Sequence, residues 1–266
     1  IVRQENSSTM SPSSSGSGTT RSLTSNKVDS TETASGPALA LKPTPIAPSQ
    51  TIRTSVSKED MQARAQLRKK LREARRGLTN QQHTDAAKRI ASRLRTLPFL
   101  DNSTTIAGYL VNDGEVNLTH FIESIWQSSH GKKLALPVLH PVCKGHLLFL
   151  SYTQHSQLVK NKYNIEEPVL SCENVIPVRQ CDVILMPLVG FDVNGNRLGM
   201  GGGYYDRTLS FTQRAPDSHS FSGSKAPKLV GIAHDIQEVD ALPIAPWDVP
   251  LDAIVTPSRT LQFTKP

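Results

Sequence analysis

The chain has 266 residues, a formal net charge of +7 at pH 7 and three cysteines, Cys143, Cys172 and Cys181. The odd cysteine count without a CxxC pair argues against a disulfide framework and against a cysteine-based zinc site. No apolar run is long enough for a transmembrane helix. A basic chain of this kind suits phosphorylated ligands, nucleic acid or a membrane surface.

The amino-terminal segment differs in composition from the rest of the chain. Residues 1–57 are rich in Ser, Thr and Pro, with almost no aromatic residue and no apolar period. Such a segment cannot bury enough apolar surface to offset its ordering entropy. We therefore expect a disordered tail over 1–57 and a single folded domain over 58–266. The acid-poor start could also serve as an organelle transit peptide, but it lacks amphipathic periodicity, so we expect a cytoplasmic protein.

A basic amphipathic helix is predicted over 59–77. Between Arg64 and Arg76 there are seven basic residues and one acid, Glu73, a local excess of +6. An apolar stripe runs beside a basic stripe at helical spacing, formed by Leu67, Leu71, Ala74 and Leu78 on one side and Arg64, Arg68, Arg72 and Arg75 or Arg76 on the other. The basic stripe is either a solvated face or, through arginines at i and i+4, a site for a triphosphate.

Short apolar runs then alternate with helical stretches. Thr79 is a good N-cap for a second helix that ends at Pro98, and a third runs from Asn117 or Thr119 through Ser128. Val, Ile and Leu runs predict strands at 105–110, 133–139, 146–152, 182–189, 228–233 and 251–256. Residues 164–180 read as irregular. This order indicates an α/β fold with a mostly parallel sheet covered on both faces.

The most informative stretch is the glycine loop, residues 196–207. Four of the sixteen glycines fall within five positions, 199–203. The loop lies between a predicted strand and a predicted helix over 204–211, an arrangement that points backbone N–H groups at an anion. It is neither a Walker A motif nor a Rossmann fingerprint. The alternatives are a turn that only reverses the chain and a phosphate cradle flanked by Arg197 and Arg207.

Several acids surround this loop in the sequence. Asp206 lies in the first turn of the following helix, where it either complements the helix dipole or binds Mg²⁺. Asp248 and Asp252 are either solvated loop acids or a second Mg²⁺ ligand. The turn Asp113-Gly114-Glu115-Val116 follows the first predicted strand, where a carboxylate can bind the amide and amino groups of a heterocycle.

These residues resemble those of a known family. The segment 188–207, the basic opening helix, the turn 113–116 and the closing stretch Pro246 to Asp252 are similar to the 5-formyltetrahydrofolate cyclo-ligases, also called methenyltetrahydrofolate synthetases. The likeness spans about 60–258, and its separate segments occur in the family's order. The resemblance implies a three-layer Rossmann-like fold with a mostly parallel central sheet, of the NagB/RpiA/CoA-transferase-like kind.

The resemblance also implies an activity, namely the ATP- and Mg²⁺-dependent conversion of 5-formyltetrahydrofolate to 5,10-methenyltetrahydrofolate, ADP and phosphate. In that reaction the formyl oxygen attacks the γ-phosphate of ATP, and N10 closes the ring as phosphate departs. The chemistry requires positioning and neutralisation of phosphate charge rather than covalent help.

Roles for individual residues follow from the same resemblance. Mg²⁺ is expected at Asp206 and Asp248, and the pterin at Glu115 with Leu110 and Val111 nearby. The expected catalytic residues are Arg197, Tyr204 and Asp206. The folate is expected to border residues 200–204, which are Met200, Gly201, Gly202, Gly203 and Tyr204. ATP is expected at Arg64, Arg68, Arg197, Leu198, Gly199, Met200, Gly201, Gly202, Gly203, Tyr204, Tyr205 and Arg207.

One departure from the family pattern concerns the loop's charge. Some members carry Arg and Lys at the positions of Met200 and Gly202, whereas this chain has the glycine-only form common in bacterial members. The phosphate charge would then fall to Arg64, Arg68, Arg197 and Arg207. We expect small-molecule substrates, no nucleic acid or membrane partner, and a monomer, with a dimer as the alternative. The competing hypothesis is a non-catalytic nucleotide- or RNA-binding protein of the same fold.

Overall fold

The computed structural model describes residues 56–128, 131–213 and 226–264. These residues belong to one compact unit, Thr51–Pro266. The predicted disordered tail lies outside the described residues apart from its last two, and so does most of the polar loop at 214–227. Both therefore stay predictions.

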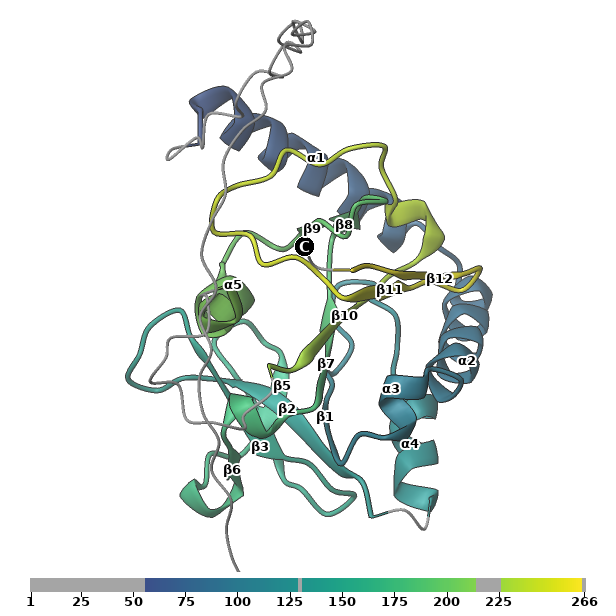
Figure 1. The fold of residues 1–266 in the computed structure, drawn as a ribbon, viewed down its shortest axis with the longest axis vertical. Coiled ribbons are helices and arrows are strands. Elements are labelled where there is room, and N and C mark those ends of the chain that lie inside the picture. Colours follow the sequence, from purple (N-terminus) through teal and green to yellow (C-terminus); the bar gives the residue numbers. More distant parts are fainter. Residues whose placement is uncertain (1–55, 129–130, 214–225, 265–266) are drawn as a thin grey trace, which may run out of the picture. The chain divides into compact units, whose positions relative to one another are not determined.

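An eight-stranded sheet forms the centre of the fold, in the order β12-β11-β10-β7-β1-β2-β3-β6 (Figure 1). The five middle strands pair in parallel, as when Ile106 of β1 aligns with Leu134 of β2 and Val183 of β7. The antiparallel strands β12 and β3 flank these five. The middle strands are β11 (Ala253–Val255), β10 (Lys228–Ile232), β7 (Val183–Pro187), β1 (Thr105–Ala107) and β2 (Lys133–Leu139), and the outer ones are β12 (Thr260–Gln262), β3 (Leu147–Ser151) and β6 (Val175–Ile176).

Helices cover both faces of the sheet, because alternate residues of the buried strands point to opposite sides. Val183 and Leu185 pack into one core and Ile184 and Met186 into the other. Figure 1 shows α2 (Asn80–Arg95), α3 (Pro98–Asp101) and α4 (Thr119–Gln127) on one side and α5 (Tyr204–Leu209) on the other. The predicted α/β class with a mostly parallel, two-side-covered sheet is confirmed.

Helix α1 (Lys58–Arg76) lies across the end of the sheet rather than on a face (Figure 1). It begins where the Ser57 side chain accepts a hydrogen bond from Asp60 N, and it ends at Gly77. Of the predicted apolar stripe, Leu71 is buried and Leu67, Ala74 and Leu78 are half-buried, and Arg64 and Arg75 of the basic stripe are buried as well. The reason is that the surface below α1 offers carboxylates and carbonyl oxygens, which bind guanidinium groups.

Most predicted elements are present, with shifted ends. The second helix ends at Arg95, so Pro98 begins α3 instead of closing α2. Thr79 caps α2 as predicted, through a capping box with Gln82. The first strand stops at Ala107 instead of residue 110, because the chain turns so that Tyr109 Oη donates to Val116 O.

The region predicted to be irregular, 164–180, contains short ordered elements. A hairpin pairs β4 (Leu158–Lys160) with β5 (Glu166–Pro168), and β6 joins the edge of the main sheet. A second hairpin pairs β8 (Gly190–Phe191) with β9 (Arg197–Leu198), and β9 leads directly into the glycines at 199–203. The sequence misses these strands because two or three residues are too few to show a period. Among the described residues, no helix is long and apolar enough to cross a membrane.

Candidate active site

The candidate site lies where the chain order of the strands reverses. From β1 the chain continues to β2 on one side of the sheet, whereas β7 pairs with β1 on the other side. The Asp113–Val116 turn follows β1, and the glycine loop follows β7 through the β8–β9 hairpin. In open α/β sheets, ligands bind in the crevice at the carboxyl ends of the strands at such a point.

The glycine loop presents unpaired backbone donors. Gly201 and Gly203 have positive φ angles of 95° and 65°, which residues with a side chain seldom adopt. Within the described residues, the N–H groups of Gly199, Met200, Gly201, Gly202 and Gly203 donate to no protein acceptor. Successive free N–H groups form a concavity suited to an anion. The geometry favours the cradle over a turn that only reverses the chain.

Arg197 and Asp206 form an ion pair at the base of this loop. Asp206 Oδ1 accepts from Arg197 and from Val249 N, while Oδ2 has no partner among the described residues. Arg197 is buried, and its Nε has no hydrogen-bond partner in the described part of the chain. A buried donor without a partner is costly, so Arg197 Nε and Asp206 Oδ2 are atoms that a ligand could satisfy.

Arg64 and Asp248 form a second buried pair. Arg64 Nη1 and Nη2 donate to the two oxygens of Asp248 at 2.6 and 2.9 Å, and Nη1 also donates to Pro243 O at 2.6 Å. Asp248 Oδ2 accepts a further bond from Ala245 N. Arg64 was predicted to contact phosphate, but here its guanidinium ties α1 to the loop that precedes β11.

Arg68 and Arg207 hold the glycine loop from its two ends. Arg68 Nε donates to Gly199 O at 2.8 Å. Arg207 donates to Gly202 O and Gly145 O, and its guanidinium carbon lies 5.8 Å from the centre of the Tyr204 ring. Burial and the neighbouring charge of Arg64 lower the pKa of Arg68. A bound anion would stabilise the charged form of Arg68, which the positive charge of Arg64 disfavours.

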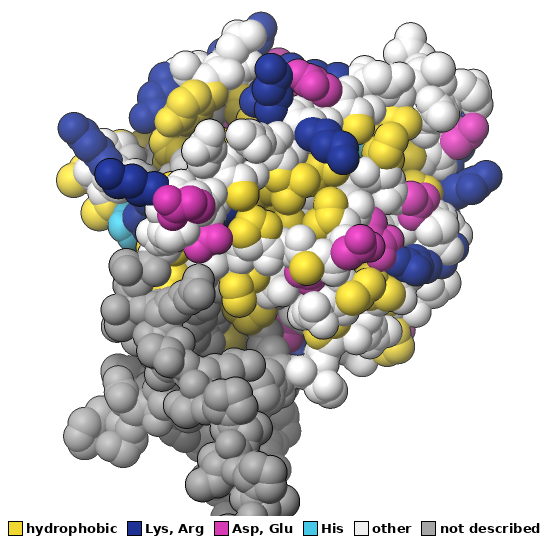
Figure 2. Space-filling model, turned by 90° about the horizontal axis from the view of Figure 1, so that it is seen from above, with side chains coloured by type: hydrophobic (Ala, Val, Ile, Leu, Met, Phe, Trp, Pro, Cys, Tyr) yellow, Lys and Arg dark blue, Asp and Glu magenta, His cyan; other side chains and the backbone are white. Residues whose placement is uncertain are grey.

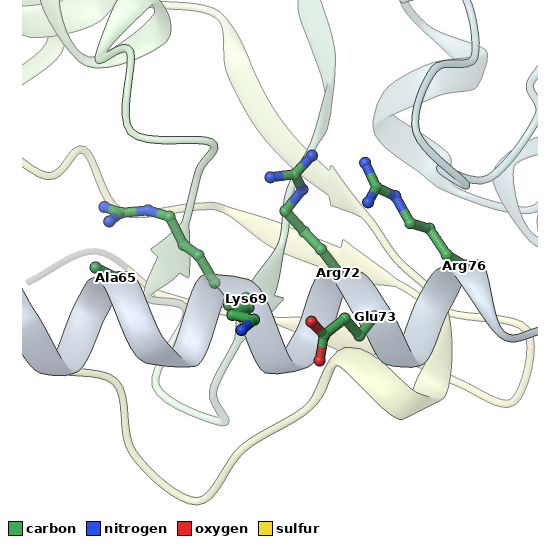
Figure 3. A pocket seen from close by; sticks show the side chains of 6 residues that line it. Ala65, Lys69, Arg72, Glu73 and Arg76 are labelled. Carbon is green, nitrogen blue, oxygen red and sulfur yellow. The ribbon is translucent and has the colours of Figure 1, made fainter.

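A basic groove of about 250 Å³ runs along α1 beside Arg68. In Figure 3 the Arg72 and Arg76 side chains extend in the same direction from the helix. The groove is lined by Ala65, Arg68, Lys69, Arg72, Glu73 and Arg76. Seen from above in Figure 2, the molecule shows Lys and Arg side chains near Asp and Glu side chains, with hydrophobic side chains between them. The stretch is predicted to be either a solvated face or a phosphate site, and both stay predictions; the groove is cationic, but its Arg72 and Arg76 pair with Asp113.

Glu115 lies in the turn that follows β1, with its side chain 11% exposed. Its Oε2 accepts from Asn112 N at 3.2 Å, and its Oε1 lies 3.8 Å from Arg75 Nη2. Burial raises the pKa of Glu115 to about 7, against the opposing charge of Arg75. A carboxylate that titrates near neutrality is typical of functional sites. Leu110 is half-buried and Val111 exposed on the segment that leads to this turn.

The remaining predicted residues lie around the same loop. Leu198, in β9, is buried, whereas Met200, in the glycine loop, is 50% exposed. Burial raises the pKa of Tyr205, to which the charge of Glu115 contributes. Tyr204 Oη lies 2.7 Å from Tyr163 Oη, at the tip of the β4–β5 hairpin. The sequence analysis missed Tyr163 because it predicted no element between the strand at 146–152 and the irregular region at 164–180.

Arg75 and Asp113 were named in the sequence analysis, in the basic stripe and in the turn 113–116, but neither was given a role of its own. Arg75 is fully buried and donates to Asp113, whose carboxylate also pairs with Arg72 and Arg76. A signal for Arg75 was present, because it follows the apolar Leu71 by one helical turn and therefore shares its buried face.

Comparison with known proteins identifies the group to which this chain is related. Residues 60–257 match the model of the 5-formyltetrahydrofolate cyclo-ligase family. The chain belongs to this family. It is 42% identical over 193 residues to the 5-formyltetrahydrofolate cyclo-ligase of Escherichia coli K12, covering 73% of this chain and 100% of that protein. It is 40% identical to the cyclo-ligase of Haemophilus influenzae, covering 71% of this chain and 95% of that protein.

Solved structures of methenyltetrahydrofolate synthetases share the fold. The protein of Aquifex aeolicus superposes with a TM-score of 0.61 at 29% identity, covering 75% of this chain and 92% of that one. The protein of Mycoplasma pneumoniae gives a TM-score of 0.53 at 27% identity, covering 73% and 98%. The family resemblance and fold predicted from the sequence are confirmed, and the chain is an enzyme of the cyclo-ligase family.

The carboxylates present fit in part the Mg²⁺ that the sequence resemblance implies. Among the described residues, no group of three or more His, Cys, Asp or Glu side chains could hold a metal ion. Mg²⁺ bound with phosphates requires only one or two carboxylates besides water. Asp206 has an oxygen free for this role, whereas both oxygens of Asp248 are bonded to Arg64. The predicted pair of ligands therefore stays a prediction, with Asp206 the better placed.

Proposed function

We propose that this protein converts 5-formyltetrahydrofolate to 5,10-methenyltetrahydrofolate with cleavage of ATP to ADP and phosphate. The formyl oxygen attacks the γ-phosphorus, the bond to the β-phosphate oxygen breaks, and ADP leaves. N10 then attacks the activated formyl carbon, phosphate leaves, and N10 gives up its proton. Membership of the cyclo-ligase family supports this reaction over the competing hypothesis of a non-catalytic nucleotide- or RNA-binding protein.

The observation that carries the proposal is the set of free N–H groups from Gly199 to Gly203 beside cationic side chains. In our proposal these N–H groups hold the phosphates and Arg68 adds charge from α1. Positioning and charge neutralisation are the main requirements of phosphoryl transfer. The glycine-only loop makes backbone donors, rather than loop side chains, the principal phosphate ligands.

Different residues are proposed to bind the folate and the Mg²⁺-bound phosphates of ATP. Glu115 accepts hydrogen bonds from the amide and amino groups of the pterin, which requires the carboxylate form. Asp206, whose Oδ2 has no partner among the described residues, would hold Mg²⁺, with Asp248 as the second carboxylate if it were released from Arg64. When bound, Mg²⁺ neutralises charge on the phosphate oxygens. Arg197, held by Asp206, offers its unpaired Nε to the same phosphates. Small-molecule substrates agree with membership of the enzyme family, whereas the monomeric state and the cytoplasmic location stay predictions.

The proposal is tested by mixing the protein with Mg·ATP and 5-formyltetrahydrofolate and following the absorbance of methenyltetrahydrofolate. We expect turnover from the wild type. Asp206→Asn keeps the acceptor for Arg197 and Val249 N but removes the charge. It should lower kcat by about 100-fold or more, since metal-ion stabilisation of phosphoryl transfer amounts to several kcal/mol.

Asp240→Asn, which changes an exposed acid, is the matched control and should keep wild-type turnover. Absence of product from folded wild-type protein would refute the enzyme assignment. Unchanged kcat in Asp206→Asn would remove Asp206 from the site while leaving the reaction in place.

A further inference from the structure

Arg75 joins segments of the site that are far apart in the sequence. Its side chain is 0% exposed, near the carboxyl end of α1. Nε donates to Asp113 O at 2.8 Å, Nη1 donates to Leu188 O at 3.0 Å, and Nη2 donates to Asp113 Oδ2 at 2.7 Å. One guanidinium therefore contacts the turn after β1 and the end of β7.

The same guanidinium contacts both proposed sides of the reaction. Nη2 lies 3.8 Å from Glu115 Oε1, on the folate side, and 3.9 Å from Met200 Sδ, in the glycine loop. Leu188 O also accepts from Gln237 Nε2 at 2.6 Å, which fixes the strand end from the other side. Arg75 therefore connects Glu115 with the glycine loop, because its guanidinium lies close to both.

The turn that Arg75 holds is otherwise an unfavourable conformation. Asp113 has a φ of 52° and Gly114 a φ of 74°, so two successive residues are left-handed. Asp113 is tolerated there because Arg72, Arg75 and Arg76 bind its carboxylate. Burial alone would raise the pKa of Asp113, but these hydrogen bonds hold it well below its usual range. The arginines therefore maintain the backbone from which Glu115 projects.

A gain in stability is a poor explanation for a fully buried arginine. Buried ion pairs often contribute no more than well-packed apolar side chains would, because desolvation offsets the attraction. A planar guanidinium group instead fixes the geometry of its partners, because its several N–H donors point in fixed directions. An arginine that meets Asp113, Leu188 O and Met200 Sδ at once fixes where those segments lie relative to each other.

We propose that Arg75 is a positioning residue, which aligns Glu115 with the glycine loop so that the formyl oxygen meets the γ-phosphate. The inference rests on the proposed function, and Arg75 itself contacts no reacting atom. Misplacement of a reacting group by about 1 Å costs about 100-fold in rate, so loss of this alignment should reduce turnover without removing either binding surface.

The test compares Arg75→Leu and Arg75→Lys with Lys70→Leu. Lys70 is an exposed cation on the same helix, outside the basic groove and not among the residues that bind Asp113. We expect Arg75→Leu to lower kcat with 5-formyltetrahydrofolate by about 10- to 100-fold and to change the KM for ATP by less than about twofold. Lys70→Leu should stay within about threefold of wild type in both constants.

The pH profile separates positioning from a general loss of structure. The charged and titratable groups facing Glu115 are Arg75, Asp113, Tyr109 and Tyr205. The nearby His234 stays neutral, because burial lowers its pKa to about 4. Arg75 is the cation among these groups, so Arg75→Leu should move the acid limb of kcat/KM for folate to higher pH. Arg75→Lys should keep the limb near its wild-type position while kcat still falls.

The outcomes are distinct. If wild type is active and Arg75→Leu matches it in kcat and in pH profile, the positioning role is wrong and the proposed function stands. If wild type forms no product, the proposed function fails and the positioning role with it. If Arg75→Leu does not fold, Arg75→Lys is the deciding variant. Wild-type kcat in Arg75→Lys would refute the proposal that the planar guanidinium of Arg75 positions Glu115.

Discussion

At the scale of single residues, Glu115 combines a cost in stability with a proposed function. Its carboxyl binds a proton more tightly in the folded protein, with a pKa of about 7, than in the unfolded chain. Between pH 4.5 and 7 the folded state keeps a proton that the unfolded state has lost. Stability therefore falls as pH rises through this window, and the full cost is present above pH 7.

We predict that Glu115→Gln is more stable than wild type at pH 8 and close to it at pH 5. The expected gain at pH 8 is on the order of 2–3 kcal/mol, measured by thermal or urea unfolding at both pH values. The same substitution should raise the KM for folate, because glutamine cannot replace a carboxylate that accepts two donors. Glu123→Gln, on the exposed side of α4, controls for loss of an acid. A gain of equal size at both pH values would contradict the assignment.

At the scale of elements, α1 carries two arginines of the same predicted role that the structure separates. The resemblance assigned Arg64 and Arg68 together to the phosphates. Arg64 is buried against Asp248, with side-chain exposures of 6% and 13%, whereas Arg68 lines the basic groove. Breaking a buried pair by removing one partner costs about 3–5 kcal/mol, because a charge is left uncompensated.

We therefore predict different effects of the two alanine substitutions. Arg64→Ala should lower the free energy of unfolding by about 3 kcal/mol or more. Arg68→Ala should lower it by less than about 1 kcal/mol and should raise the KM for ATP before that for folate. Urea unfolding and steady-state kinetics measure both. Arg64→Ala combined with Asp248→Ala should recover part of the lost stability, and Lys70→Ala provides an exposed control on the same helix. Equal losses of stability in the two single variants would contradict this division.

The contrast between these arginines shows what a sequence can and cannot predict about a helix. The spacing of Leu67, Leu71 and the arginines predicts the helix and its basic character, because these depend on neighbours along the chain. It does not predict that Arg64 meets Asp248, 184 residues away. Which acid faces which arginine depends on where the tertiary fold places the loop before β11 relative to α1. The local sequence does not predict that placement.

At the scale of the whole molecule, the same distinction holds for the fold and the site. Runs of Val, Ile and Leu predict the buried parallel strands, and the glycine loop predicts a phosphate-binding end of the sheet. The β4–β5 and β8–β9 hairpins are held by a few backbone pairs and by contacts such as Tyr163 with Tyr204. Such short strands form because the rest of the fold brings them together, so their sequences show little pattern.

The extent of the catalytic unit leads to a last prediction. The family match spans residues 60–257, and α1 begins at Lys58 behind its Ser57 cap. A chain of residues 56–266 keeps that cap and every proposed site residue. It should therefore retain the kcat, both KM values and the melting temperature of the full chain.

A chain that starts at Gly77 lacks Arg64, Arg68 and Arg75 and should form no methenyltetrahydrofolate, because it loses the basic wall of the phosphate site and the link from Asp113 to Leu188. Parallel kinetics and thermal unfolding of the three chains test this. A large loss of turnover on removing residues 1–55 alone would make that segment part of the enzyme, whereas turnover without α1 would place the phosphate site elsewhere.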